Sequence, residues 1–182
     1  SDLIRDRRTI QPKDFSLREV HRDIIERVVQ NAIWAPNHGM TQPWRFVVFT
    51  GDARSELATF LGNEYTRTTS PEKFMQRKHD NLVQRPQQSS VVIALGLEHD
   101  PKGKIDPEEE RLAMACAVQN MYLTCTAYGL GAFWATSSVL TSDAMRAYLG
   151  LPEGAECLGL FYMGYPSVEW PKGYRKPWTD LV

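Results

Sequence analysis

The segment 35–46, Ala-Pro-Asn-His-Gly-Met-Thr-Gln-Pro-Trp-Arg-Phe, joins a stretch with helical periodicity to an apolar run. Pro36 predicts the end of the helix, because proline has no N–H to donate and its ring clashes with the preceding turn. Pro43 leads into a strand predicted over residues 44–50. The polar groups between the prolines favour a loop that binds a flat polar ligand, although a well-satisfied surface turn would have the same composition. These groups belong to Asn37, His38, Gly39, Thr41 and Gln42.

The sequence on either side of this segment predicts both helices and strands. Residues 16–19, Ser-Leu-Arg-Glu, have the form of a capping box that would start a helix reaching residue 33. A continuously apolar run predicts a central strand at 91–97. Further helices are expected at 52–62 and 141–149, and further strands at 133–137 and 157–163. Because helices and strands mix without strict βαβ alternation, the expected fold class is α+β.

The longest predicted helix, over residues 106–128, has a strong start. Asp106 is a suitable N-cap residue, Pro107 suits the first helical position, and three glutamates follow at the positive end of the helix dipole. The rest of the helix is apolar almost all round, so it should be buried on several sides. It is therefore expected in the centre of the core or at a subunit interface.

The composition is that of an ordinary globular chain of 182 residues, expected to form a single domain over 1–182. The formal net charge of −1 gives no reason to expect nucleic acid or an anionic membrane as a partner. No apolar run approaches the roughly 20 residues that span a bilayer, so a cytoplasmic location is expected. Without an H-E-x-x-H or C-x-x-C motif, no metal site is expected. Three cysteines are expected to be reduced core residues: Cys116, Cys125 and Cys157.

Two polar segments leave more than one interpretation open. Residues 63–89 are the least hydrophobic part of the chain, and a helix starting near Ser70 is expected there. This segment could be a solvated helix, a mobile flap or a lid that shapes access for a substrate. Residues 167–182 are rich in proline, tryptophan and basic residues, and we expect this tail to lie across a surface, such as that of a partner subunit.

Near its start the chain carries Arg7-Arg8-Thr9, whose guanidiniums and hydroxyl can hold a phosphate through charge-assisted hydrogen bonds. A third motif, Gly-Leu-Gly-Ala-Phe-Trp-Ala-Thr-Ser, lies at 129–137. In this order the three motifs resemble those of the nitroreductase family of FMN-dependent oxidoreductases. The resemblance is closest to the compact single-domain branch, whose motifs are Arg-Arg-Ser, Ala-Pro-Asp-His…Gln-Pro-Trp and Gly-hydrophobic-Trp-Arg-Ser. It extends from Arg7 to Arg175-Lys176-Pro177.

The resemblance implies a fold, a cofactor and a reaction. The fold would be a mixed central sheet flanked by helices, in a homodimer with FMN at the subunit interface. NAD(P)H would bind as a transient co-substrate, because the chain has neither a P-loop nor a complete dinucleotide fingerprint. Nitroaromatics, quinones or similar electron-poor small molecules would then be reduced by ping-pong hydride transfer. No side chain is expected to act as the catalyst, because N5 of the flavin carries the chemistry.

The resemblance also implies roles for twelve residues. The N-terminal motif would contact the phosphate, the ribityl chain and the ring edge. Trp34 and His38 would reach the flavin of the second subunit, and Asn37 and Gln42 belong to the same polar loop. Residues 134–137 would run beside the isoalloxazine ring. The cofactor-binding residues are thus Arg7, Arg8, Thr9, Trp34, Asn37, His38, Gln42, Trp134, Ala135, Thr136, Ser137 and Arg175.

Two departures from the family pattern affect the ring edge. Gln11 stands where members often carry arginine, with Lys13 two residues later, and Ala135 stands where the compact branch has arginine after the tryptophan. A cation at the flavin edge is therefore missing or displaced. This leaves two alternatives to the reductase: a flavin-binding carrier or sensor with little turnover, and a protein that binds no flavin and uses these segments for dimerisation.

Overall fold

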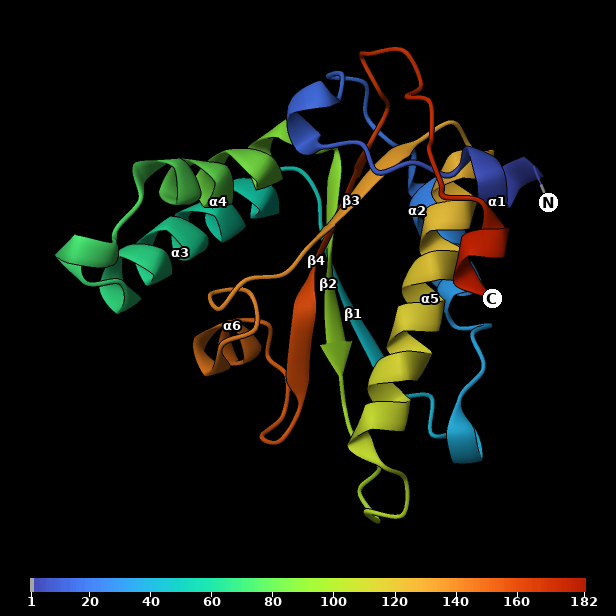
Figure 1. Ribbon diagram of the computed structural model, residues 1–182. Helices are drawn as coiled ribbons and strands as arrows, with labels where there is room; N and C mark the ends of the chain where they lie inside the picture. Colours follow the sequence, from blue (N-terminus) through green and yellow to red (C-terminus); the bar gives the residue numbers. More distant parts are fainter. Residues whose placement is uncertain (1) are drawn as a thin grey trace.

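The computed structural model describes residues 2–182, and its centre is a four-stranded sheet (Figure 1). The strand order is β1-β2-β4-β3, and all neighbouring strands pair antiparallel. An isolated parallel bridge between Thr9 and Ala132 attaches the N-terminal segment to the outer edge of β3. The strands are β1 (Trp44–Phe49), β2 (Val91–Leu97), β3 (Gly131–Ala135) and β4 (Glu156–Gly164).

Helices cover both faces of this sheet and confirm the α+β class (Figure 1). On one face lie α2 (Arg22–Ala32) and α5 (Pro107–Ala127). On the other face lie α3 (Ala53–Thr68), α4 (Gln76–Gln88) and α6 (Asp143–Tyr148). Short elements complete the chain: α1 (Asp2–Asp6) and the 3-10 turns η1 (Pro12–Asp14), η2 (His38–Met40), η3 (Pro71–Lys73) and η4 (Trp178–Leu181).

Successive side chains of a strand point to opposite faces of the sheet, so the same central strands contribute to both layers of the core. Phe161 and Met163 of β4 face the α2–α5 layer, whereas Leu160 and Tyr162 face the α3–α4 layer. Every residue of β2 is buried, which confirms the central strand predicted at 91–97. The strand predicted at 133–137 instead starts at Gly131 and ends at Ala135.

The start of α5 follows the predicted capping chemistry. The Asp106 carboxylate accepts a hydrogen bond from the Glu108 N–H at 2.9 Å, and Pro107 occupies the first turn. The expectation of burial on several sides holds for only one face of α5. Leu112 is 58% exposed and Cys116 is also exposed, so one of the three predicted core cysteines lies on the surface. The fold therefore leaves an apolar stripe of α5 uncovered.

The predicted capping box at residues 16–19 is wrong. The Ser16 hydroxyl accepts from the N–H of Arg18 at 3.4 Å, and α2 begins only at Arg22. The preceding residues are tied to the sheet instead, because the N–H of Val20 donates to Ser90 Oγ at 2.7 Å. Leu17, assigned to the buried stripe by periodicity, is fully exposed.

The helix predicted to end near Gly62 continues to Thr68 as α3. Gly62 serves close packing here, since a Cβ at this position would lie 2.8 Å from Val83 Cγ2 of α4. The segment 63–89 thus comprises the end of α3, η3 and α4, in which α4 packs along α3 (Figure 1). The surface helix predicted from Ser70 begins later, at Gln76.

The C-terminal tail returns to the N-terminal helix (Figure 1). The Trp170 indole N–H donates to the carbonyl oxygen of Asp6 at 2.7 Å. Most of residues 167–182 are exposed, so the tail covers little of its own chain. Within residues 2–182, no helix combines the length and the apolar character needed to cross a bilayer.

Candidate functional site

Four arginines line a cavity of about 820 Å³ beside the C-terminal half of α5, and we call it the arginine cavity. Asp6 contributes the only carboxylate among its lining residues, so the cavity is strongly cationic. No ion pair engages these arginines within residues 2–182. Uncompensated guanidiniums in a concave site are suited to an anion such as a phosphate. The arginines are Arg5, Arg7, Arg8 and Arg175.

Arg7 is placed by contacts that link three elements. Its guanidinium lies over the Tyr122 ring of α5, 5.2 Å from the centroid, and its Nη1 is 3.5 Å from Thr9 Oγ1. The Tyr122 hydroxyl in turn accepts a hydrogen bond from the Trp134 N–H of β3 at 2.8 Å. Burial raises the pKa of Tyr122, so this phenol stays protonated. The N-terminal motif, α5 and β3 therefore meet at one place.

Arg8 holds the tail against α1. Its Nε donates to the carbonyl oxygen of Pro171 at 2.8 Å, and its Nη1 donates to the carbonyl oxygens of Arg5 and Arg7. Gly173 lies so close that a Cβ there would be 2.4 Å from Arg8 Cζ. These contacts bring Arg175 to the cavity, 167 residues after Arg8 in the chain. The Arg8 guanidinium thus holds the tail and the N-terminal segment in place.

A second cavity, of about 380 Å³, lies where β3 ends, and we call it the α4 cavity. Lys78, Asn81 and Arg85 of α4 line one wall, and Ala135 and the following loop residues, including Thr136 and Ser137, line the other. Sequence reasoning missed the α4 residues. Their spacing of three and four positions puts them on one helix face, but the same spacing is common in solvated helices. Only the packed structure shows what that face meets.

The Trp134 side chain is part of the fold. Its indole N–H donates to the Leu158 carbonyl oxygen at 3.0 Å, and the ring packs against the α2–α5 core. The neighbouring strand approaches closely here, since a Cβ on Gly159 would lie 2.3 Å from the Ala135 oxygen. The Trp134 indole and N–H are therefore both bonded within the fold, whereas Thr136 and Ser137, just after β3, are exposed.

The polar loop predicted from residues 35–46 has strained backbone. Met40 and Gln42 have φ of 55° and 46°, in the left-handed region that side chains other than glycine rarely adopt. The Asn37 carboxamide stabilises this turn by accepting from the Gln42 N–H at 3.0 Å. His38 pairs with Glu109 at the start of α5. Strain of this kind is common at binding loops, and ligand binding by this loop stays a prediction.

The predicted site residues nevertheless do not all meet within one chain. Glu109, beside His38, and Tyr122, beside Arg7, are thirteen residues apart on α5, which is about 20 Å along the helix axis. Trp34 lies at a third place, a shallow cavity between α2 and α5, and its side chain is 84% exposed. One chain therefore brings together the N-terminal motif, Arg175 and β3, but not the polar loop.

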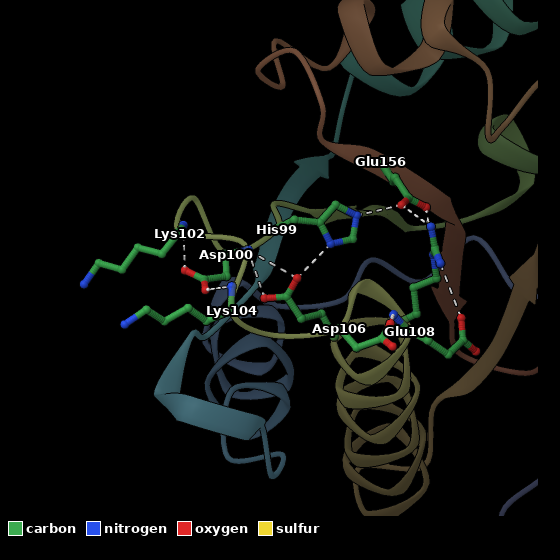
Figure 2. A network of polar contacts seen from close by, with 9 residues as sticks. His99, Asp100, Lys102, Lys104, Asp106, Glu108 and Glu156 are labelled. Carbon is green, nitrogen blue, oxygen red and sulfur yellow. Dashed lines mark hydrogen bonds and ion pairs between the residues drawn. The ribbon is translucent and has the colours of Figure 1, made fainter.

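A further polar network fixes the start of α5 (Figure 2). His99 Nδ1 is 2.7 Å from Glu110 Oε2, and His99 Nε2 is 2.7 Å from Glu156 Oε1. Glu156 also accepts hydrogen bonds from Arg111, and Glu110 accepts one from the Asp100 N–H. His99, Glu110, Glu156 and Arg111 all have charged partners, so the network fastens α5 to β4 and to the segment that follows β2. It lies at the opposite end of α5 from the arginine cavity.

The chain is similar to known proteins in both sequence and fold. The model of the nitroreductase family matches residues 4–165. YfhC of Bacillus subtilis, a candidate NAD(P)H nitroreductase by name, is 23% identical over 182 residues, covering 98% of this chain and 90% of YfhC. A nitroreductase-like family protein from Bacillus cereus superposes with a TM-score of 0.84 at 25% identity, covering 100% of this chain and 92% of that one. The fold is shared with the FMN-dependent nitroreductase NfnB of Mycobacterium smegmatis, solved with NADPH (TM-score 0.75, 20% identity, 99% and 95% covered).

Proposed function

The chain belongs to the nitroreductase family, as its motifs indicated, and on this premise we propose that it is an FMN-dependent NAD(P)H oxidoreductase. Its acceptors would be nitroaromatics, quinones or similar electron-poor small molecules. NfnB is FMN-dependent and was solved in complex with NADPH, and NAD(P)H appears in the name of YfhC. Low sequence identity makes the residues of this chain the stronger support.

The arginine cavity is the observation that carries the proposal. Arg7 and Arg175 have no carboxylate partners within residues 2–182, so their charges are available to a bound phosphate. The Gln119 amide and the Tyr122 face complete a polar and aromatic lining. This donor set fits the phosphate and ribityl end of FMN.

The edge strand β3 supplies the other requirement, a backbone for a flat ring. Two outward-facing backbone groups of β3 are already bonded. The Ala132 carbonyl oxygen accepts from the Ile10 N–H, and the Trp134 N–H donates to the Tyr122 hydroxyl. The next outward position along the strand direction is Thr136, followed by Ser137 at the mouth of the α4 cavity. We place the ring beside residues 134–137, in line with the resemblance.

A second copy of the chain is needed to complete this site. The polar loop lies about 20 Å from the arginine cavity along α5, which is too far for both to touch one ring. A partner packed antiparallel against α5 would bring its own loop to the cavity. The exposed Leu112 and Trp34 give this face the apolar and aromatic character of an interface. We therefore propose a homodimer with one FMN in each of two shared sites.

When bound, FMN would supply the redox chemistry, taking hydride from NAD(P)H and passing electrons to the acceptor in a ping-pong cycle. The role of the protein would be to bind the cofactor and to orient it. Arg7 and Arg175 would hold the phosphate, Trp34 and His38 would come from the partner, and the β3 backbone would fix the ring. Among the residues lining the two cavities, none is arranged with a partner as a nucleophile or general base.

The visible spectrum of the purified protein, followed by anaerobic addition of NADPH, tests the proposal. Flavin absorption that bleaches with NADPH and returns with a quinone is expected. Arg7→Ala should lose bound FMN, whereas Arg22→Ala, which removes an exposed arginine paired with Glu26, should retain it. A colourless protein that takes up no added FMN would overturn the proposal.

The same titration separates a second candidate, a flavin carrier or sensor. Ala135 motivates it, because the cation that the compact branch places there is missing. Flavin that remains oxidised in excess NADH and NADPH would favour the carrier. Turnover with either donor would exclude it.

A further inference from the structure

Gln42 is held in an uncommon backbone conformation by side chains that bond both of its main-chain polar groups. Its φ of 46° lies in the left-handed region. The Gln42 N–H donates to Asn37 Oδ1 at 3.0 Å, and the Gln42 carbonyl oxygen accepts from Arg45 Nη1 at 3.2 Å. A conformation of this kind persists only where the surroundings fix it, so these two bonds determine how Gln42 is placed.

Arg45 is itself fixed by Glu98. Arg45 lies opposite Gly96 in the pairing of β1 with β2, and Glu98 follows Gly96 by two residues, which puts both side chains on one face. The Nε and Nη2 atoms of Arg45 each lie 2.8 Å from Glu98 Oε2. The Glu98 N–H also donates to the Pro43 carbonyl oxygen at 2.8 Å, so the backbone pairing continues past both strands. The Arg45 guanidinium thus joins Glu98 to the carbonyl oxygen of Gln42.

The Gln42 side chain is left open to a ligand. It is exposed, and its amide forms no hydrogen bond within residues 2–182. The Asn37 carboxamide oxygen and the His38 ring, by contrast, already have partners inside the chain. An amide offers both donors and an acceptor, and a fixed backbone reduces the entropy lost when such a group binds. Gln42 is therefore pre-organised to bind a polar ligand.

We propose that Arg45, held by Glu98, is a positioning residue of the cofactor site and acts through Gln42. Arg45 fixes the left-handed turn from which the Gln42 amide reaches the FMN in the arginine cavity of the partner subunit. This inference rests on the proposed function, since it presupposes both FMN and a site shared between two chains. It gives a role to Arg45 and Glu98, to which the family resemblance assigned none.

An ion pair that served only the stability of the fold would behave differently. The side chains of Arg45 and Glu98 are 45% and 40% exposed, and pairs as exposed as these add little to the free energy of unfolding. Loss of Arg45 should therefore leave Tm nearly unchanged. It should instead release the Gln42 carbonyl oxygen, so that the turn relaxes to a commoner backbone conformation and the amide moves away from the ligand. Weaker FMN binding at unchanged stability is the signature of positioning.

The test is a double-mutant cycle on the dissociation constant of FMN from the full-length protein, with Tm recorded for every variant. Arg45→Gln should weaken FMN binding about tenfold. Gln42→Gly removes the amide, while glycine still adopts positive φ, so Arg45→Gln should cause no further loss in that background. Arg22→Gln is the matched control, because it removes an exposed arginine paired with Glu26 and should change the affinity in neither background.

Equal losses from Arg45→Gln with and without the Gln42 side chain would overturn the inference, because Arg45 would then act independently of Gln42. Wild-type affinity in either single variant would overturn it as well. Absence of FMN from the wild-type protein, even after FMN is added, would instead overturn the proposed function. If Arg45→Gln does not fold, Glu98→Gln takes its place in the cycle, and it must weaken FMN binding only where Gln42 is present.

Discussion

Removing the His99 side chain should destabilise the protein through a carboxylate that it leaves behind. The Glu110 side chain is 1% exposed, against 22% for His99. Two groups pair with this carboxylate, the His99 imidazole and the Asp100 N–H (Figure 2). Glu156 would keep its bonds to Arg111 after the change. The loss of stability in His99→Ala should therefore come mainly from Glu110, which loses a partner for its buried carboxylate.

Leaving a buried charge without its partner typically costs about 3 kcal/mol, because desolvation is no longer offset. For a chain of this length, each kcal/mol lowers Tm by a few degrees, so a fall of about 10 °C is expected. His21→Ala is the control. Its imidazole faces Asp23 across 3.5 Å, but both side chains are mostly exposed, so the loss should be no more than about 0.5 kcal/mol.

The pH dependence gives this prediction a sign. Partial burial lowers the pKa of His99, but its hydrogen bonds to Glu156 and Glu110 outweigh burial and raise that pKa above its ordinary value of 6.5. The stabilisation by protonated His99 is then complete below pH 6.5 and is lost as the pH rises through the raised pKa. The Arg111 hydrogen bond, with help from His99, lowers the pKa of Glu156 below 4.5, so its contribution is lost only at more acidic pH.

Urea unfolding at pH 6 and pH 9 tests the account. Wild type and variant are compared at equal protein concentration, because the stability of the proposed dimer would depend on concentration. The difference between wild type and His99→Ala should be large at pH 6 and clearly smaller at pH 9. Equal destabilisation at the two pH values would refute the reasoning. So would a loss at pH 6 no larger than that of His21→Ala.

Three shorter predictions concern other parts of the fold. Gly159→Ala should cost on the order of 3 kcal/mol by urea unfolding, because φ is +117° and the new Cβ would meet the Ala135 oxygen; a neutral change would contradict the close approach. If the proposed dimer forms through the exposed stripe of α5, Leu112→Glu should shift its sedimentation toward the monomer, and an unchanged dimer would exclude this stripe as the interface. Asp106→Ala should cost about 1 kcal/mol through loss of the cap on α5, with no change in denaturant m-value.

The sequence predicted the elements whose signals are local. The cap at Asp106 needs only its own neighbours, and the continuous apolar run of β2 can be buried in only a few ways. The capping box at Ser16 failed because a competing tertiary bond, from the Val20 N–H to Ser90, keeps that segment extended. Gly62 likewise looked like a helix stop, whereas contact with α4 makes it a packing residue.

The candidate site was predictable where residues are close in sequence, and hidden where the fold unites distant ones. Arg7 and Arg8 were found from their own motif, and their meeting with Arg175 in one cavity followed the family resemblance. The tail-holding bonds of Arg8 could not be read from the motif, because its partner carbonyl on Pro171 carries no sequence signal. The expectation of a site shared between subunits remains a prediction, supported by the length of α5 that separates His38 from Arg7.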